Sequence, residues 1–148
     1  MGLDGLREKL KSGTSGRLMF DEPLNRHTSW KVGGPADILF LPVSVEDLGR
    51  AVSYAYSEGL PVTVLGNGTN VLVSDKGVRG LVVKLDNIKH LVVEGTAITA
   101  GAGIGLPELS ATALQHNLSG LEFAVGIPGS LGGAIAGNAG AHGSCMAD

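Results

Sequence analysis

The glycine-rich turn Gly66-Asn67-Gly68-Thr69-Asn70 is the part of the sequence whose residue types most directly suggest chemistry. It follows a predicted strand and lacks the Gly-Lys-Ser/Thr of a Walker loop. We expect another strand after it, which excludes a Rossmann fingerprint. Successive backbone N–H groups in such a turn can surround an anion, and the side chains of Asn67, Thr69 and Asn70 add neutral donors. An ordinary hairpin turn, which the Asn67-Gly68 dipeptide favours, is an equally good interpretation.

A longer segment, from Ala124 to Ala141, is rich in glycine and alanine yet too apolar for a solvent-exposed loop. Small residues leave the backbone accessible, so a flat ligand could lie against its amide groups. The glycine density argues against an ordinary helix. Tight packing between two elements is the alternative interpretation. Ser130 does not form a nucleophile elbow, because Pro128 occupies the first glycine position of that motif.

A third glycine cluster, from Gly101 to Gly105, stands between a predicted strand and a predicted helix. It resembles a dinucleotide-binding loop only superficially, because Leu106 occupies the position of the third glycine. A structural turn is the main interpretation, and Gly103 is kept as a candidate ligand contact.

The remaining reactive side chains form no recognisable catalytic or metal-binding set. The four histidines lack metal-ligand spacing, and the single cysteine, Cys145, cannot form an internal disulfide. Arg26 and Lys31 are the basic residues nearest a glycine turn, where they could meet a phosphate or serve as ordinary surface charges. We therefore predict no catalytic residue and no metal site. The histidines stand at positions 27, 90, 116 and 142.

Composition narrows the function further. The 148 residues include 24 glycines without a three-residue period, which excludes collagen, and 43% hydrophobic residues, which argues against disorder. A net charge of −3 and 4% aromatic residues make nucleic acid or an anionic membrane an unexpected partner. No signal peptide or membrane-spanning stretch is apparent, so we expect a cytoplasmic protein.

The elements that position the first turn are predicted by periodicity. A helix is expected over residues 1–11, followed by a mostly irregular stretch from 17 to 31. A strand is expected over Ala36–Leu41, and a helix capped by Ser44 leads to a second strand, Pro61–Leu65. This strand–helix–strand order predicts a βαβ unit.

The second half of the chain is expected to be different. Short strands are predicted at 71–73, 80–85, 91–94 and 97–100, with a helix from Pro107 to Asn117. We divide the chain into an N-terminal helix and linker (1–20), a first lobe (21–85) and the start of a second lobe (86–148). We expect further chain, including a substrate domain, beyond Asp148.

Several of these motifs, in this order, resemble the UDP-N-acetylenolpyruvoylglucosamine reductase family, also called UDP-N-acetylmuramate dehydrogenase. The resemblance runs from about Asn25 to Gly143. It is carried by four segments: Thr28–Ala36, Val64–Asp75, Gly120–Ala134 and Asn138–Gly140.

The resemblance implies an α/β (α+β) flavoprotein fold of the vanillyl-alcohol-oxidase type, with two lobes and non-covalent FAD. The family uses NADPH as hydride donor to reduce UDP-N-acetylglucosamine enolpyruvate in peptidoglycan precursor synthesis, and a monomer is expected. The family's catalytic Ser, Arg and Glu lie outside residues 1–148, so this chain alone is expected to be inactive. His142 stands where the family usually has Tyr.

The resemblance also implies which residues contact FAD. In the first lobe they are Leu65, Gly66, Asn67, Gly68, Thr69, Asn70, Val71 and Leu72. In the second they are Gly103, Ala124, Gly126, Ile127, Pro128, Gly129, Ser130, Gly132, Gly133, Ala134, Asn138, Gly140 and Ala141. Another FAD oxidase or dehydrogenase of the same fold, or a binding module without turnover, is the alternative.

Overall fold

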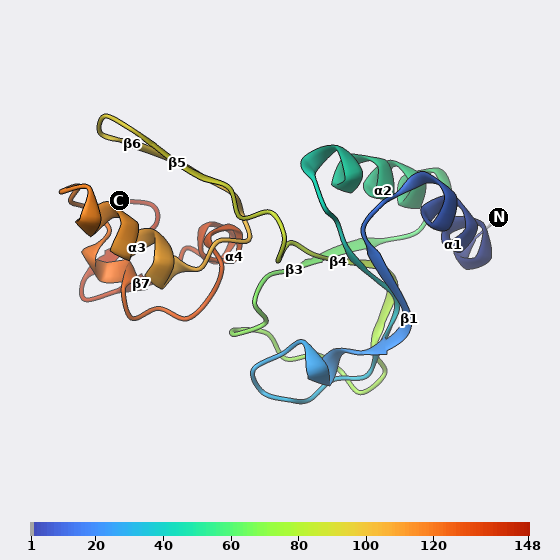
Figure 1. Cartoon of the computed structure of the whole chain (residues 1–148). Helices are drawn as coiled ribbons and strands as arrows, with labels where there is room; N and C mark the ends of the chain where they lie inside the picture. Colours follow the sequence, from blue (N-terminus) through green and yellow to red (C-terminus); the bar gives the residue numbers. More distant parts are fainter. Residues whose placement is uncertain (1) are drawn as a thin grey trace. The chain divides into compact units, whose positions relative to one another are not determined.

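The computed structural model describes residues 2–148, which divide into two compact units (Figure 1). Unit 1 extends to Asn87, and unit 2 runs from Ile88 to Asp148. Unit 1 contains α1 (Leu3–Gly13), β1 (Arg17–Pro23), a 3-10 turn (Leu24–Arg26), β2 (Pro35–Leu41), α2 (Val45–Ser57), β3 (Val62–Leu65) and β4 (Val78–Lys84).

Unit 1 is built on a four-stranded sheet with the order β1-β2-β4-β3. The strands β2, β4 and β3 are parallel, and β1 adds an antiparallel edge to β2. Residues 36–40 of β2 and 80–83 of β4 are buried without interruption. Continuous burial is expected for central parallel strands, because both faces of such a sheet are covered.

The two faces of this sheet are covered differently. Helices α1 and α2 pack on the face that presents Ile38, Phe40, Leu81 and Val83. The opposite face, which presents Leu39, Leu65 and Val82, packs against Leu24 and Val73 from the connections between strands. The segment that follows the glycine turn therefore packs, through Val73, on the face of the sheet opposite α1 and α2.

Helix α2 begins where its sequence predicts. The Ser44 hydroxyl accepts a hydrogen bond from the Asp47 amide at 3.1 Å, which satisfies a donor of the first turn. The buried carboxylate of Asp47 accepts hydrogen bonds from the amides of Ser15 and Val43, and Arg50 donates to the same side chain. Burial opposes ionisation of Asp47, but these donors outweigh it and hold its pKa below the usual value. Asp47 therefore links helix α2 to the segments that contain Ser15 and Val43.

Three expectations for unit 1 are wrong. Residues 17–23 form β1 rather than an irregular stretch, because they pair along the whole edge of β2. Residues 71–73 are not a strand but part of the connection from β3 to β4. The hairpin interpretation of residues 66–70 is also wrong, since β3 and β4 are parallel and their connection must cross back along the sheet. The predicted N-terminal helix is confirmed as α1, although Met1 lies outside the described residues.

Unit 2 is a smaller mixture of hairpins and short helices. Strands β5 (Leu91–Glu94) and β6 (Ala97–Ala100) form an antiparallel hairpin, as predicted. They are followed by α3 (Leu106–Gln115), a 3-10 turn (Glu122–Ala124), α4 (Leu131–Ala136), β7 (Gly140–Ala141) and β8 (Ser144–Cys145). The core of this unit is formed by Leu106, Phe123, Ala124 and Ala134.

The glycine-rich segment of unit 2 does contain a helix, contrary to the expectation from its composition. Helix α4 is only six residues long, and the Ser130 hydroxyl accepts a hydrogen bond from the Gly133 amide at its start. One short turn tolerates two glycines because Ala134 buries its side chain in the core. Among residues 2–148, no helix is both long and apolar enough to cross a bilayer.

Candidate functional site

The turn 66–70 leaves the carboxyl end of β3 and is fixed against a preceding segment of unit 1. The carbonyl oxygen of Gly68 accepts a hydrogen bond from the Ser29 amide at 2.9 Å. Gly68 has a φ of 68°, and a Cβ there would collide with the carbonyl oxygen of His27 and lie 3.0 Å from the α-carbon of Thr28. Glycine at position 68 is therefore required by the protein's own backbone.

The N–H donors of this turn are suited to binding an anion. Among the described residues, the main-chain amides of Asn67, Gly68 and Asn70 donate to no other backbone group. The side chains of Asn67 and Asn70 are exposed, so neutral amide donors surround the same bend. A set of backbone and amide N–H groups fits a phosphate oxygen, since it offers donors without needing a net positive charge.

The predicted contacts on either side of this turn differ in environment. Leu65 is buried among the residues that cover the sheet, so it anchors the turn. Val71 and Leu72 are exposed, and Leu72 retains 81% of its accessible surface. Gly66 and Thr69, within the turn itself, are half-buried. Both basic candidates, Arg26 and Lys31, are exposed. The Arg26 guanidinium lies 3.7 Å from the Glu22 carboxylate.

In unit 2, the two glycine-rich segments lie side by side. Ala102 and Ile104 accept hydrogen bonds from the amides of Gly132 and Leu131 at 2.9 and 2.8 Å. A Cβ at Gly132 would lie 2.9 Å from that of Ala102. Gly103 is itself buried, and its amide donates to the Ile88 carbonyl at 2.9 Å. Close packing between elements, the alternative interpretation of this segment, therefore accounts for Gly132.

Other glycines of the same segment have open space beside them. A Cβ at Gly126 would meet no heavy atom within 4 Å, and at Gly133 it would meet only the Ser130 hydroxyl, at 3.2 Å. Ala124, Ser130 and Ala134, close to these glycines in the sequence, are buried. A firm base with bare backbone above it is a surface on which a flat ligand can rest.

The remaining predicted contacts of unit 2 surround that base. Asn138 has a φ of 45°, and its side-chain oxygen accepts a hydrogen bond from the Ala147 amide at 3.0 Å. Gly140 lies so close to Cys145 that a Cβ would approach its side chain to 2.7 Å. Of the remaining candidates, Ile127, Gly129 and Ala141 are partly buried. Pro128 is exposed.

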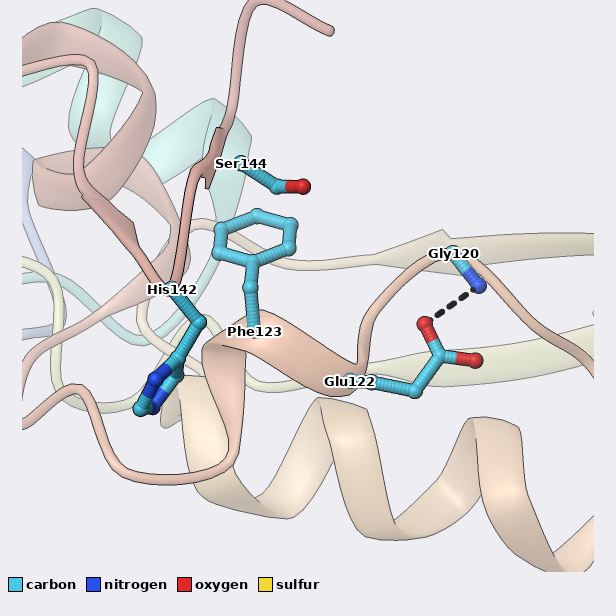
Figure 2. Close-up of a pocket in the computed structure, with 5 residues that line it drawn as sticks. All are labelled: Gly120, Glu122, Phe123, His142 and Ser144. Carbon is cyan, nitrogen blue, oxygen red and sulfur yellow. Dashed lines mark hydrogen bonds between the residues drawn. The ribbon is translucent and has the colours of Figure 1, made fainter.

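An open depression of about 340 Å³ in unit 2 was not predicted from the sequence (Figure 2). It is lined by Gly120, Glu122, Phe123, His142 and Ser144. The Glu122 carboxylate accepts a hydrogen bond from the Gly120 amide at 2.8 Å and points away from His142 (Figure 2). Figure 2 shows Ser144 and His142 on opposite sides of the Phe123 ring. The hydroxyl, imidazole and carboxylate are therefore not arranged as a catalytic triad.

No group of histidine, cysteine and acidic side chains in residues 2–148 could hold a metal ion. Unpaired backbone amides in unit 1 and unobstructed glycine backbone in unit 2 are the features of the described residues that are suited to a ligand. Each unit thus offers a different chemistry, one suited to an anion and the other to a planar ring.

Comparison with known proteins agrees with this chemistry. Residues 36–148 match the family model described as FAD binding domain. The UDP-N-acetylenolpyruvoylglucosamine reductase of Caldanaerobacter subterraneus is 53% identical over 146 residues, which cover 99% of this chain and 47% of that protein. The corresponding reductase of Moorella thermoacetica is 47% identical over 148 residues, 100% of this chain and 49% of that protein. The chain thus spans about half the length of the curated relatives it matches.

Solved structures give the same fold. The UDP-N-acetylenolpyruvylglucosamine reductase of Thermus caldophilus aligns with a TM-score of 0.72 and 36% identity, over 90% of this chain and 46% of that one. Alkyldihydroxyacetonephosphate synthase aligns with a TM-score of 0.69 at 20% identity, over 93% of this chain and 29% of that one, which shows the fold alone. The predicted α+β flavoprotein fold is confirmed, and so is the resemblance to the reductases. Because the family model covers most of its length, the chain belongs to the FAD-binding domain family.

Proposed function

We propose that this chain is the FAD-binding portion of a UDP-N-acetylenolpyruvoylglucosamine reductase. The observation that carries the proposal is the match of residues 36–148 to the FAD-binding family, combined with identities of 43–53% to reductases over nearly the whole chain. Alkyldihydroxyacetonephosphate synthase and Physcomitrella patens BBE-like 1, two structural relatives with other names, are each 20% identical to it, which favours the reductase over another flavin oxidase or dehydrogenase.

Two surfaces of the chain are suited to FAD. The amides of Asn67, Gly68 and Asn70 hold its diphosphate, and the bare backbone at Gly126 and Gly133 takes its ring system. FAD supplies the redox chemistry when it is bound, and the residues of this chain bind and orient it. The turn 66–70 contains no histidine or cysteine that could form a covalent link, so the cofactor is held without a bond.

The whole protein is proposed to accept hydride from NADPH and to act on the UDP-linked enolpyruvyl sugar. It thereby serves peptidoglycan precursor synthesis in the cytoplasm, and through it cell shape and division. No residue of the present chain is assigned a catalytic role. We propose a monomer without nucleic-acid or membrane partners.

Cofactor retention tests the proposal directly. The purified 148-residue chain is mixed with excess FAD and desalted, and its visible absorbance is recorded beside a heat-denatured sample treated identically. The folded chain should keep a flavin spectrum, and acid precipitation should release all of the flavin into the supernatant. A folded chain that stays colourless would overturn the assignment.

A second assay addresses turnover. NADPH oxidation is followed with and without the enolpyruvyl sugar nucleotide, using the FAD-loaded chain. We expect no substrate-dependent oxidation by this chain alone. Sustained, substrate-dependent turnover would show that catalytic groups are present within residues 1–148.

A further inference from the structure

The segment Thr28–Gly33 carries part of the family resemblance, and Lys31 is one of the two basic candidates for a phosphate, but none of its residues is among those assigned to FAD above. It precedes residue 36, where the match to the FAD-binding family begins. It contains the only tryptophan of the chain, Trp30, and Lys31, which among residues 2–148 is the only lysine whose backbone lies in the left-handed region, with a φ of 57°. Both features call for an explanation beyond packing.

The segment is a fixed loop. The buried Thr28 hydroxyl donates to the carbonyl oxygen of Val32 at 3.0 Å, and the Lys31 amide donates to the carbonyl oxygen of Thr28 at 3.3 Å. Thr28 retains only 2% of its accessible surface. A buried hydroxyl that closes the loop from inside restricts the directions in which Trp30 and Lys31 can point.

This loop lies directly beside the turn proposed to bind the diphosphate. The Ser29 amide donates to the Gly68 carbonyl at 2.9 Å, and the Gly34 amide donates to the Ser74 carbonyl, also at 2.9 Å. Between these bonds, a Cβ at Gly33 would approach the side chain of Val73 to 2.7 Å. The two segments, 28–34 and 68–74, therefore run together within unit 1.

Both segments carry exposed apolar side chains. Trp30 is 68% exposed and Leu72 is 81% exposed, and Val32 and Val71 also lie open. Within the described part of the chain, the ammonium group of Lys31 has no carboxylate partner. A lysine pays a conformational cost in the left-handed region that glycine would avoid, and such strain persists where a function requires the side chain.

We propose that Trp30 and Lys31 bind the ADP half of FAD. The Lys31 ammonium pairs with the diphosphate held by the turn 66–70, and the Trp30 indole packs against the adenosine that follows it. A cation beside neutral amide donors strengthens binding of a dianionic group, and an exposed indole suits a flat heterocycle. This inference rests on the proposed FAD site and adds two side chains to it.

The single tryptophan provides a test that requires no substitution. ADP carries the diphosphate and adenosine but no flavin, so any change it causes in tryptophan emission comes from the nucleotide half. Titration with ADP should change the emission saturably, and prior loading with FAD should abolish the response. Unchanged emission over the range in which ADP displaces FAD would overturn the role of Trp30.

Substitution of Lys31 separates a ligand role from a structural one. Lys31→Gly relieves the left-handed backbone, so the FAD-free chain should melt at a higher temperature while FAD dissociates about tenfold more readily. The matched control is Asn117→Gly at the end of α3, where φ is also 57°. That variant should also melt higher and keep the FAD affinity of the wild type. Equal FAD affinities in the two variants would overturn the role of Lys31.

Trp30→Ala should weaken FAD binding by about tenfold, and Trp30→Phe should restore most of it because a flat ring remains. Tyr56→Ala is the control, since Tyr56 on α2 is 71% exposed, similar to Trp30. If the wild type retains FAD and Trp30→Ala retains it equally well, the present inference fails and the proposed function stands. If the folded wild type binds neither FAD nor ADP, the proposed function fails.

Discussion

Gly68 in unit 1 and Gly126 in unit 2 belong to segments that resemble the same cofactor site, yet they are glycines for different reasons. Around Gly68 the space is filled by the protein itself, namely the backbone of His27 and Thr28. Around Gly126 the space is open, with no heavy atom within 4 Å of a Cβ position. A glycine can thus be required because the protein's own backbone leaves no room for a side chain, or because a ligand needs that room. Only the surroundings of each glycine distinguish the two cases.

The largest effect is expected at Gly68. In Gly68→Val the new side chain collides with the His27 carbonyl and forces a β-branched residue to a φ of 68°, so unit 1 should lose about 3 kcal/mol or more of folding free energy. Any loss of FAD in this variant would follow from disruption of the protein by this clash rather than from blocked approach of the cofactor. Denaturant unfolding of the FAD-free chain measures it, and an unchanged midpoint would contradict the clash.

Gly132 should behave like Gly68, on a smaller scale. A Cβ there would lie 2.9 Å from that of Ala102 and 3.2 Å from its carbonyl oxygen, so Gly132→Ala should cost about 1–3 kcal/mol through overpacking. Gly105→Ala is the control, because its nearest neighbour would be 3.9 Å away. Thermal unfolding of both variants checks the difference, and equal melting temperatures would refute the packing role of Gly132.

Gly126 should show the opposite behaviour. Gly126→Ala should leave the FAD-free fold unchanged or stabilise it by about 0.4–1 kcal/mol, because the unfolded chain loses freedom. The added methyl group should nevertheless weaken FAD binding by about tenfold if the ring lies against this backbone. Equilibrium titration with FAD measures the affinity. Tight binding by Gly126→Ala would remove this position from the proposed site and leave the role of Gly68 unaffected.

A smaller effect is expected from acid, which should lower the folding stability of unit 1 more than that of unit 2. The carboxyl groups with lowered pKa values, Glu46, Asp47 and Glu58, all lie in unit 1. A carboxyl whose pKa is lower in the folded state contributes stability above its unfolded pKa, and that stability is lost as the pH falls through its folded value. Unit 1 should therefore open at a higher pH than unit 2.

Hydrogen exchange of assigned amides, followed as the pH is lowered below about 4, measures this order. Asp47→Asn should flatten the pH dependence of unit 1, because the buried side chain loses its charge while its size is kept. If the pH profile of the variant matched that of the wild type, Asp47 would not be the source of the acid sensitivity.

Local signals in the sequence predict local structure well. Helix α2 is specified within four residues by Ser44 and Asp47, and β2 by one apolar run. The position of β4 between β2 and β3 depends on pairing between residues far apart, which no local pattern records. The apolar residues 71–73 resemble a strand, but the parallel pairing of β3 and β4 requires this stretch for the return connection.

The candidate site was predictable to a similar extent. The turn 66–70 and the segment 126–134 are visible as glycine patterns. The sequence could not distinguish Gly68 and Gly132, which are required by packing, from Gly126. Trp30 was missed because an isolated aromatic residue in an apparently irregular stretch gives no periodic signal. The hydrogen bond from Thr28 to Val32 that closes the loop around it is visible only in the structure.

Leu65, the last residue of β3, and Val73 flank the turn proposed to bind the cofactor, and both pack on the face of the sheet opposite α1 and α2. The turn cannot become disordered without exposing part of that face to water. Occupancy of the turn and integrity of the sheet are therefore thermodynamically linked, and a ligand present at about 100 times its Kd adds about 2.7 kcal/mol to the stability of unit 1. A chain without bound cofactor would then be less stable as well as colourless.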